Sequence, residues 1–332
     1  MTEPQRPYIG GQAVLEGVMM RSPKSFVVAV RRPDGSLAIR EQAWGELGGG
    51  LKFLKWPFVR GAVTLVESLW NGYSALGFSA EQAMPEEEKA KADGAGKAED
   101  LATTVTMVIS TVFAVGLFVA APHLLTVLTG RLLHIALPTT ALLFHVIDAV
   151  FKLGIFLGYL GLISRSKQVQ RLFQYHGAEH KAIWAYESGG PLTAEAAQGF
   201  TTLHPRCGTS FLVMVMVVSL IVSAAVFSQV PQLSVHLWLH NVLIVLLKLP
   251  LLFPVAGITY EIQRATAKPG CPAWLTWLAK PGLLLQKVTT REPTLDQLEV
   301  AVTALARALA REEGRAAEDG VHIVQSALVP AS

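Results

Sequence analysis

Charge is what this 332-residue sequence has least of. Asp, Glu, Lys and Arg make up only 16% of the residues, while 51% are hydrophobic. An ordinary soluble chain has roughly 25% charged residues, so the shortage excludes an ordinary soluble domain and favours a chain that lies in a lipid bilayer. The net charge is only +3 and the cations are scattered, so no nucleic-acid partner is expected.

Cysteine is scarce as well. Cys207 and Cys271 are the only two, which excludes a disulfide framework. Cys207 stands in a basic segment, and this favours the reducing side of a membrane. A secretory signal peptide is not expected, because Glu16 and Arg21 interrupt the first apolar stretch. Membrane insertion should therefore rely on internal segments.

Residues 1–45 are predicted to form a small cytoplasmic β unit. Phe26–Arg31 is rich in β-branched residues, and Ser36–Trp44 returns as a second strand. The turn between them is Arg32-Pro33-Asp34-Gly35, where proline presets φ and glycine accepts a positive φ. The preceding segment, GGQAVLEGVMMR, can add a third strand.

Residues 46–83 are predicted to form an amphipathic helix, followed by a charged linker at 84–100. Apolar side chains recur every three or four positions; they are Ala62, Leu65, Val66, Leu69, Tyr73 and Leu76. We expect the helix to lie at the membrane surface or to dock on the bundle. The alternative is a spanning helix, in which Glu67 would enter the hydrocarbon at considerable cost.

Four transmembrane spans are predicted, each close to the length that crosses a bilayer. They are Leu101–Ala121, Thr139–Ile163, Ser210–Val230 and Leu239–Tyr260. The first two form a hairpin over residues 101–163, and the last two form a second hairpin over residues 210–260.

Cations indicate the orientation of these spans. Lys and Arg gather in the connection 164–209 and in the tail 261–332, whereas the two opposite connections carry only Arg131. By the positive-inside rule, both termini and the polar connection are predicted to be cytoplasmic, in a bacterial inner membrane.

The tail is predicted to end in a helix that begins with a capping box, Thr294 and Gln297. One narrow apolar seam follows a heptad-like spacing and consists of Leu295, Leu298, Val302, Leu305 and Leu309. This seam could dock on a helix of a partner or of a second copy, or it could pack on the β unit of its own chain.

The segment richest in chemistry is the connection 164–209. His176 and His180 lie one helical turn apart in the pattern H-x-x-E-H, so they would share a face and could bind one metal ion. Glu179 between them could act as a general base. His204 and Cys207 add a second imidazole and a thiol. Together the two histidines, His204 and Cys207 make a tetrahedral set that suits zinc.

Other interpretations of this connection stay open. The histidines could hydrogen-bond backbone carbonyls in a metal-free hairpin, with Arg206 paired to Glu179, or the site could do acid–base chemistry without a metal. Four protein ligands would imply a structural metal and three a catalytic one. Glu187 and Glu261 are carboxylate candidates for a third ligand.

Two further groups of polar residues qualify as candidates. His145, Asp148 and Lys152 share one face of the second predicted span, and Lys248 in the fourth span is a second cation for Asp148. Such a group is either a polar clasp between spans or a path for protons or ions. Glu16, in the N-terminal unit, either belongs to a turn or contributes to the cytoplasmic site.

At these residues the sequence resembles the bacterial YqhQ-like membrane protein family. The resemblance rests on GGQAVLEGVMMR, KWPFVRG, FQYHGAEHK, HPRCGTSF and ITYE, and runs from about residue 8 to about residue 290. It implies a membrane protein and a metal-dependent enzyme, with His176, Glu179, His180, His204 and Cys207 as the residues that match the pattern.

The sequence therefore predicts an α-helical polytopic membrane protein with four spans and a small cytoplasmic β unit. Its expected activity is that of a metal-dependent hydrolase at the cytoplasmic membrane face, with zinc as the metal. The competing interpretation is a non-enzymatic factor that binds a membrane-protein partner, or a second copy, and uses the metal as a structural element. A transporter is the third interpretation and rests on Asp148 and Lys152 alone.

Overall fold

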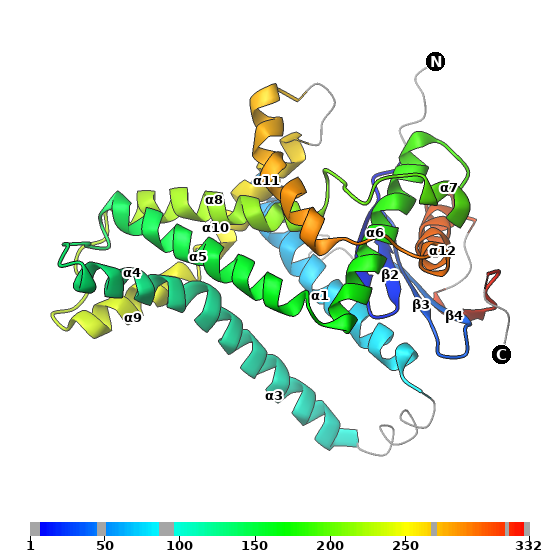
Figure 1. The fold of residues 1–332 in the computed structure, drawn as a ribbon, viewed down its shortest axis with the longest axis horizontal. Coiled ribbons are helices and arrows are strands. Elements are labelled where there is room, and N and C mark those ends of the chain that lie inside the picture. Colours follow the sequence, from blue (N-terminus) through cyan, green and yellow to red (C-terminus); the bar gives the residue numbers. More distant parts are fainter. Residues whose placement is uncertain (1–6, 45–50, 86–95, 267–270, 316–318, 329–332) are drawn as a thin grey trace.

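The computed structural model describes residues 7–44, 51–85, 96–266, 271–315 and 319–328. It is mostly helical, with a bundle of long helices on one side and a layered α/β part on the other (Figure 1). Most of the predicted linker, residues 86–95, lies outside the described residues.

The sheet is larger than predicted, because it has five antiparallel strands in the order β1-β2-β3-β4-β5. They are β1 (Gly10–Val14), β2 (Gly17–Arg21), β3 (Ser25–Arg31), β4 (Leu37–Ala43) and β5 (Gly320–Val324). The predicted turn between β3 and β4 is present: Gly35 has a φ of 83° and the Asp34 carboxylate accepts a hydrogen bond from Ser36 N at 2.9 Å. The segment before β3 forms a hairpin rather than one strand.

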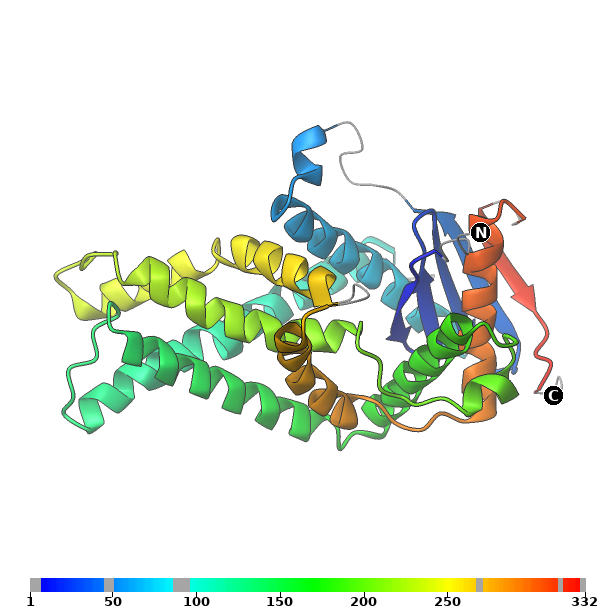
Figure 2. The ribbon, with the colours of Figure 1, turned by 90° about the horizontal axis from the view of Figure 1, so that it is seen from above.

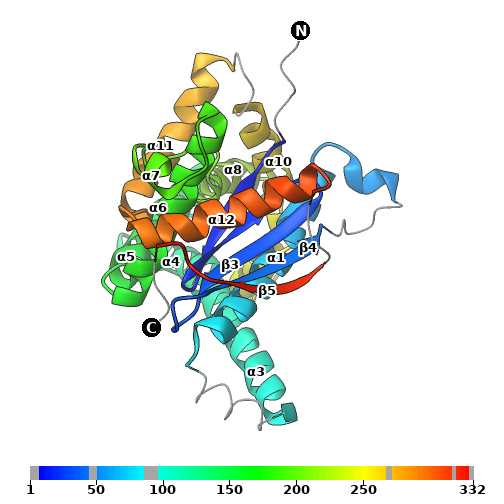
Figure 3. The ribbon, with the colours of Figure 1, turned by 90° about the vertical axis from the view of Figure 1, so that its right-hand side faces the viewer.

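Helices cover both faces of this sheet (Figures 2 and 3). On one face, α6 (Lys167–Ser188) and α12 (Leu295–Glu312) bury side chains such as Leu298 and Leu305 against β2 and β3. The predicted capping box starts α12. The apolar seam of the tail is thus largely covered within its own chain, and only its first residue, Leu295, stays exposed.

The other face of the sheet is covered by α1 (Val59–Ala83), which follows the short 3-10 helix η1 (Lys52–Lys55). Ala75 and Phe78, near the end of α1, pack on the sheet. The beginning of α1 crosses α10 (Leu252–Thr266) so closely that a Cβ on Gly61 would lie 2.9 Å from the Cα of Gly257. The helix predicted over 46–83 therefore connects the sheet to the bundle.

Three helices among the described residues are long and apolar enough to cross a membrane, and one bent helix pair could form a fourth span. The first, Thr104–Leu132, extends well beyond the predicted end at Ala121. It comprises α3 (Gly96–Val115) without its first turns, a π-helical turn η2 (Gly116–Ala120) and α4 (Ala121–Leu132). The next two are α5 (Leu142–Ile163) and α8 (Gly208–Phe227).

The predicted fourth span is broken. It consists of α9 (Leu237–Lys248) and α10, bent by 40° across a short break. Pro250 lies in that break, and a proline interrupts a helix because it lacks an N–H and crowds the preceding turn. The segment predicted as the fourth span, Leu239–Tyr260, is therefore a bent helix pair that could cross the membrane as one span.

The connection 164–209 is also more regular than a polar loop. It holds α6, which is 22 residues long, and the short α7 (Ala194–Gln198). The tail contains a further helix, α11 (Ala273–Thr289), before α12. Together α6, α11 and the start of α8 meet where the helical bundle joins the α/β part (Figure 1).

Candidate metal centre

Two of the predicted ligands lie on consecutive turns of α6. The rings of His176 and His180 have centroids 4.5 Å apart. Cys207 caps the N-terminus of α8 and brings its sulfur to within 3.1 Å of Nε2 of His176. One ligand atom from each of these three residues lies within 4.8 Å of the others. Ligands of a tetrahedral zinc ion lie about 3.5 Å apart, so this group has the right dimensions for one ion.

Backbone carbonyls fix the orientation of both imidazoles. Nδ1 of His176 lies 2.8 Å from the carbonyl oxygen of Thr289, and Nδ1 of His180 lies 2.5 Å from that of Thr202. A carbonyl can only accept, so each Nδ1 carries the hydrogen and each Nε2 of a neutral ring keeps its lone pair. Metal-binding histidines are held in this way by groups behind them.

Burial of His180 also prepares this ring to bind a metal ion. His180 is almost completely buried, and its Nε2 has no hydrogen-bond partner of good geometry among the described residues. Desolvation by burial lowers the pKa of His180, which keeps the ring neutral. A neutral imidazole with a buried, unused lone pair is the form that binds a metal ion. The three side chains thus offer ligand atoms close enough together to hold one divalent metal ion.

His204, the fourth predicted ligand, lies beside this group and is not part of it. Its Nδ1 accepts a hydrogen bond from Arg206 N at 3.3 Å, and its Nε2 lies 3.5 Å from a carboxylate oxygen of Glu187. Its backbone N–H donates to Gln286 at 2.8 Å. Burial lowers the pKa of His204 to about 4. Its predicted role as a ligand stays a prediction.

Glu179 faces β1 from α6 and is buried. Its carboxylate lies so close to Gly11 that a Cβ there would be 2.8 Å from Oε1, and it accepts a backbone hydrogen bond from Gly11. Desolvation raises the pKa of Glu179, while the charges of His176 and His204 act in the opposite direction. A carboxyl group with a raised pKa can hold and release a proton near neutral pH.

The other predicted carboxylates belong to ion pairs. Glu187 pairs with Arg206. Glu261 pairs with Arg60 at 2.5 Å and accepts a hydrogen bond from the backbone N–H of Phe58, the residue before α1. The structure places neither carboxylate in the His/His/Cys group.

Glu16 lies in the tight turn between β1 and β2, where it adopts a positive φ of 51°. Its carboxylate pairs with Arg171 and accepts a hydrogen bond from the hydroxyl of Tyr175 at 3.3 Å. Both partners belong to α6, so Glu16 ties the β hairpin to the helix that carries the histidines. It supports the centre and contributes no ligand atom to it.

The roles of the Thr289 and Thr202 carbonyls could not be predicted from the sequence, because every residue has a backbone carbonyl. One signal was available at Gly177, inside the H-x-x-E-H pattern. A Cβ there would lie 2.1 Å from the carbonyl oxygen of Arg291. Glycine is needed because the segment that supplies the Thr289 carbonyl presses against α6 at this point.

The second polar cluster lies inside the helical bundle. Asp148 pairs with Lys248 at 2.8 Å and with Lys152 at 3.4 Å. Lys248 also lies 3.3 Å from Nδ1 of His123, whose Nε2 lies 2.9 Å from the amide oxygen of Asn241. His123 and Asn241 were missed, because single polar residues in apolar runs carry no spacing signal.

His145 was predicted to share one helical face with Asp148 and Lys152, and its ring lies next to this cluster. Its ring stacks on Phe227 with centroids 6.1 Å apart, and neither ring nitrogen has a hydrogen-bond partner of good geometry among the described residues. His145 therefore packs as an aromatic side chain next to the cluster.

The fold and the site define a class of protein: several helices fit to cross a membrane, joined to an α/β part that carries a candidate metal centre. The chain belongs to the family described as "Protein of unknown function (DUF1385)", whose model matches residues 56–311. It is similar to "Uncharacterized protein YqhQ" of Bacillus subtilis (strain 168), with 34% identity over 305 residues, 89% of this chain and 90% of that protein. No solved structure matches the chain. The resemblance to the YqhQ-like family is confirmed.

Proposed function

We propose that this protein is a zinc-dependent hydrolase held in the bacterial inner membrane and acting at its cytoplasmic face. One observation carries the proposal: His176, His180 and Cys207 turn their ligand atoms toward one point, and carbonyls behind both rings fix the lone pairs in that direction. Three protein ligands leave a fourth position for water or substrate, as in catalytic zinc sites.

Glu179 is the proposed general base. It lies on the same helix as both histidines, and its buried carboxyl group has a raised pKa. The N–H of Gly11 holds the carboxylate in place. A bound divalent metal would supply a Lewis acid that activates water, and Glu179 would accept the proton released when that water attacks.

The cytoplasmic assignment is supported by charge. Arg165 follows α5, Lys167 and Arg171 lie at the start of α6, and Lys287 lies near the end of α11. The opposite connections, between α4 and α5 and between α8 and α9, carry no cation beyond the end of α4. Under the positive-inside rule the α/β part and the candidate metal centre face the cytoplasm.

The proposal is tested by metal content together with activity. The full chain is purified in mild detergent without a histidine tag, and zinc is measured by elemental analysis beside His176→Ala/His180→Ala. We expect about one zinc per chain in the wild type, in line with a single three-ligand site, and almost none in the variant. The metal site would be disproved if the wild type held less than about 0.2 zinc per chain and added Zn²⁺ did not raise this content.

Activity is then assayed with a panel of chromogenic esters, amides and phosphodiesters. Glu179→Gln should keep the zinc and the fold while hydrolysis falls by roughly 100-fold or more, the usual contribution of a general base. Equal hydrolysis by Glu179→Gln and the wild type would refute the assigned base.

A non-enzymatic membrane factor with a structural metal is the second candidate. The packing of Glu179 against Gly11 favours it, because this carboxylate is closed off from solvent. So does the exposed apolar face of α1, which includes Leu69 and Trp70 and could contact a membrane-protein partner or a second copy. In that case Glu179→Gln should leave every activity of the protein in the cell unchanged, whereas removal of His180 should not.

Transport is the third candidate. A cavity of about 430 Å³, lined in part by Thr139, His240 and Asn241, reaches the polar cluster in the bundle. From Asn241 the hydrogen bonds continue through His123 to Lys248. For a transporter, Asp148→Asn would abolish function while the zinc content stays normal.

A further inference from the structure

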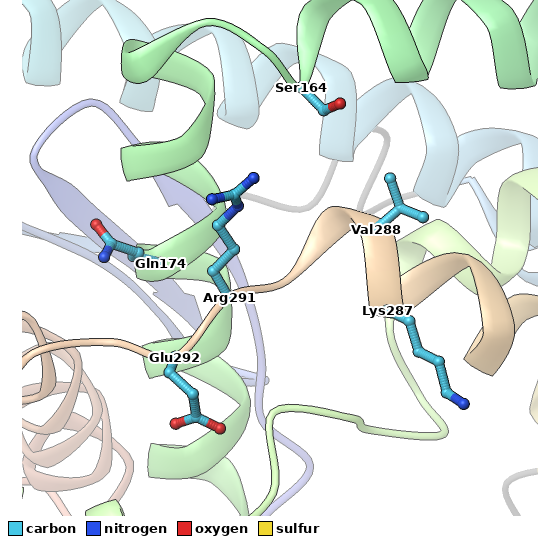
Figure 4. Close-up of a pocket in the computed structure, with 6 residues that line it drawn as sticks. All are labelled: Ser164, Gln174, Lys287, Val288, Arg291 and Glu292. Carbon is cyan, nitrogen blue, oxygen red and sulfur yellow. The ribbon is translucent and has the colours of Figure 1, made fainter.

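A pocket of about 570 Å³ lies on the far side of the segment that supports the metal centre. Six residues line it: Ser164, Gln174, Lys287, Val288, Arg291 and Glu292. They come from the end of α5, from α6, and from the end of α11 and the chain that follows it (Figure 4). Its size is within the range of ligand-binding pockets.

The pocket lies where apolar and polar surfaces meet. Ser164 directly follows Ile163, the last residue of the candidate span α5. Leu162 and Leu284, close to the pocket on α5 and α11, both expose their apolar side chains. A ligand bound in the pocket would therefore place its polar part beside α6, and its apolar part could contact the exposed side chains of α5 and α11.

The charge of the pocket is positive. Glu292 is the one carboxylate among the lining residues, and Lys181 neutralises it in an ion pair of 2.6 Å. Arg291 and Lys287 remain as cations of the lining. Arg165, next to Ser164, and Lys167, the first residue of α6, add two exposed cations nearby. Basic pockets at the cytoplasmic ends of spans bind anionic lipid headgroups.

Arg291 is presented from a fixed backbone. Its N–H donates to the carbonyl of Phe173 at 2.9 Å, and its own carbonyl oxygen packs against Gly177 of α6. In Figure 4 its guanidinium group points toward Ser164 and the end of α5, while the side chains of Glu292 and Lys287 point away from it. A guanidinium with a fixed base can bind two oxygens of a phosphate at once.

We propose that this pocket binds the phosphate group of an anionic phospholipid headgroup. Arg291 contacts the phosphate oxygens, Lys287 adds positive charge on the other side of the pocket, and the acyl chains lie along the exposed apolar side chains of α5 and α11. Lipid binding needs no metal ion, so this proposal can be tested independently of the proposed hydrolase activity. Because Thr289 also supplies the carbonyl behind His176, the lipid lies two residues along the chain from a support of the metal centre.

The test uses the full chain in mild detergent and a fluorescent phosphatidylglycerol as the probe. Binding is measured for the wild type, for Arg291→Gln/Lys287→Gln, and for Lys24→Gln/Arg315→Gln, which removes the same charge from the α/β part. We expect the first variant to bind roughly 30-fold more weakly, from about a fivefold loss per cation. The control variant should bind like the wild type. Arg291→Lys/Lys287→Arg, which keeps both charges, should recover most of the affinity.

Competitors distinguish the source of the phosphate. Unlabelled phosphatidylglycerol should displace the probe, whereas phosphatidylcholine and inorganic phosphate should each be at least about tenfold poorer, because one lacks net charge and the other lacks acyl chains. Displacement by inorganic phosphate at equal concentration would overturn the lipid assignment. Wild-type affinity in Arg291→Gln/Lys287→Gln, with normal zinc content, would overturn the pocket and leave the metal centre intact.

Discussion

The candidate metal centre and the polar cluster in the bundle use similar side chains in opposite ways. In the centre, Nε2 of His180 is buried without a hydrogen-bond partner of good geometry among the described residues. In the cluster, Lys248 contacts both Asp148 and His123, and His123 contacts Asn241. The first group turns lone pairs toward a common point, whereas the second group closes on itself.

This difference shows how burial alone fails to identify a function. A buried polar atom without a partner costs free energy, so a protein keeps it where something else binds. A closed network needs no additional ligand and can hold helices together. The centre is therefore the better candidate for chemistry, and the cluster is the better candidate for a clasp between α4, α5 and α9.

The largest effect is expected from Asp148→Asn. The change removes the carboxylate that pairs with Lys248 and leaves a buried cation unpaired, which costs about 3–5 kcal/mol of unfolding free energy. The measurement is unfolding by denaturing detergent from mixed micelles. Zinc content should not change, because the cluster shares no residue with the centre.

Two companions make this test specific. Asp148→Asn/Lys248→Met removes both charges and should recover most of the stability. Lys152→Met removes the more distant and less buried cation and should cost less than about 1 kcal/mol. If Asp148→Asn unfolds like the wild type, the cluster does not hold the helices together, and the result favours a role in transport.

A smaller effect is expected from His180→Ala. Loss of this ligand should abolish stoichiometric zinc and, with it, the stability that metal binding contributes, about 3 kcal/mol at free zinc 100-fold above the dissociation constant. Chelation of the wild type should produce the same shift in thermal unfolding, and chelation of the variant should produce none. If a chelator leaves the melting temperature of the wild type unchanged, metal binding does not contribute to the stability of the fold.

The spans and the β unit could be predicted because their signals are local. Long apolar runs identified α5 and α8, and the turn at Pro33-Asp34-Gly35 placed β3 and β4. The break at Pro250 was visible as a proline inside an apolar run, but the sequence did not show that both halves continue as helices. The fifth strand, far along the chain at Gly320–Val324, has only five residues and pairs by long-range contact.

The site was partly predictable for the same reason. His176 and His180 have helical spacing, so their common face could be read from the sequence. That Cys207 joins them, and that His204 three positions earlier does not, depends on how the chain enters α8. The pairing of Glu261 with Arg60 is likewise a tertiary contact, and no spacing rule predicts it.

Gly177→Ala should have an intermediate effect on the centre. The new methyl group would lie 2.1 Å from the carbonyl oxygen of Arg291, so the segment 289–291 must move away from α6. The Thr289 carbonyl would move with it, and zinc affinity should fall by about 10–100-fold, as for other losses of support behind a ligand. Gly190→Ala, just after α6, is the matched control, because its nearest neighbour lies at 3.5 Å. Equal zinc affinity in both variants would show that the carbonyl of Thr289 does not hold His176.

The smallest effect on metal binding is expected from His204→Gln, and it refines the ligand set. The structure engages Nδ1 of His204 with the N–H of Arg206 and leaves the residue outside the three-ligand group. Loss of this single hydrogen bond should change stability by only about 1 kcal/mol, and zinc should remain near one per chain. Zinc titration of His204→Gln beside His180→Ala decides between a three-ligand and a four-ligand site. If His204→Gln loses zinc as completely as His180→Ala, His204 is the fourth ligand, the shell is closed, and the metal is structural rather than catalytic.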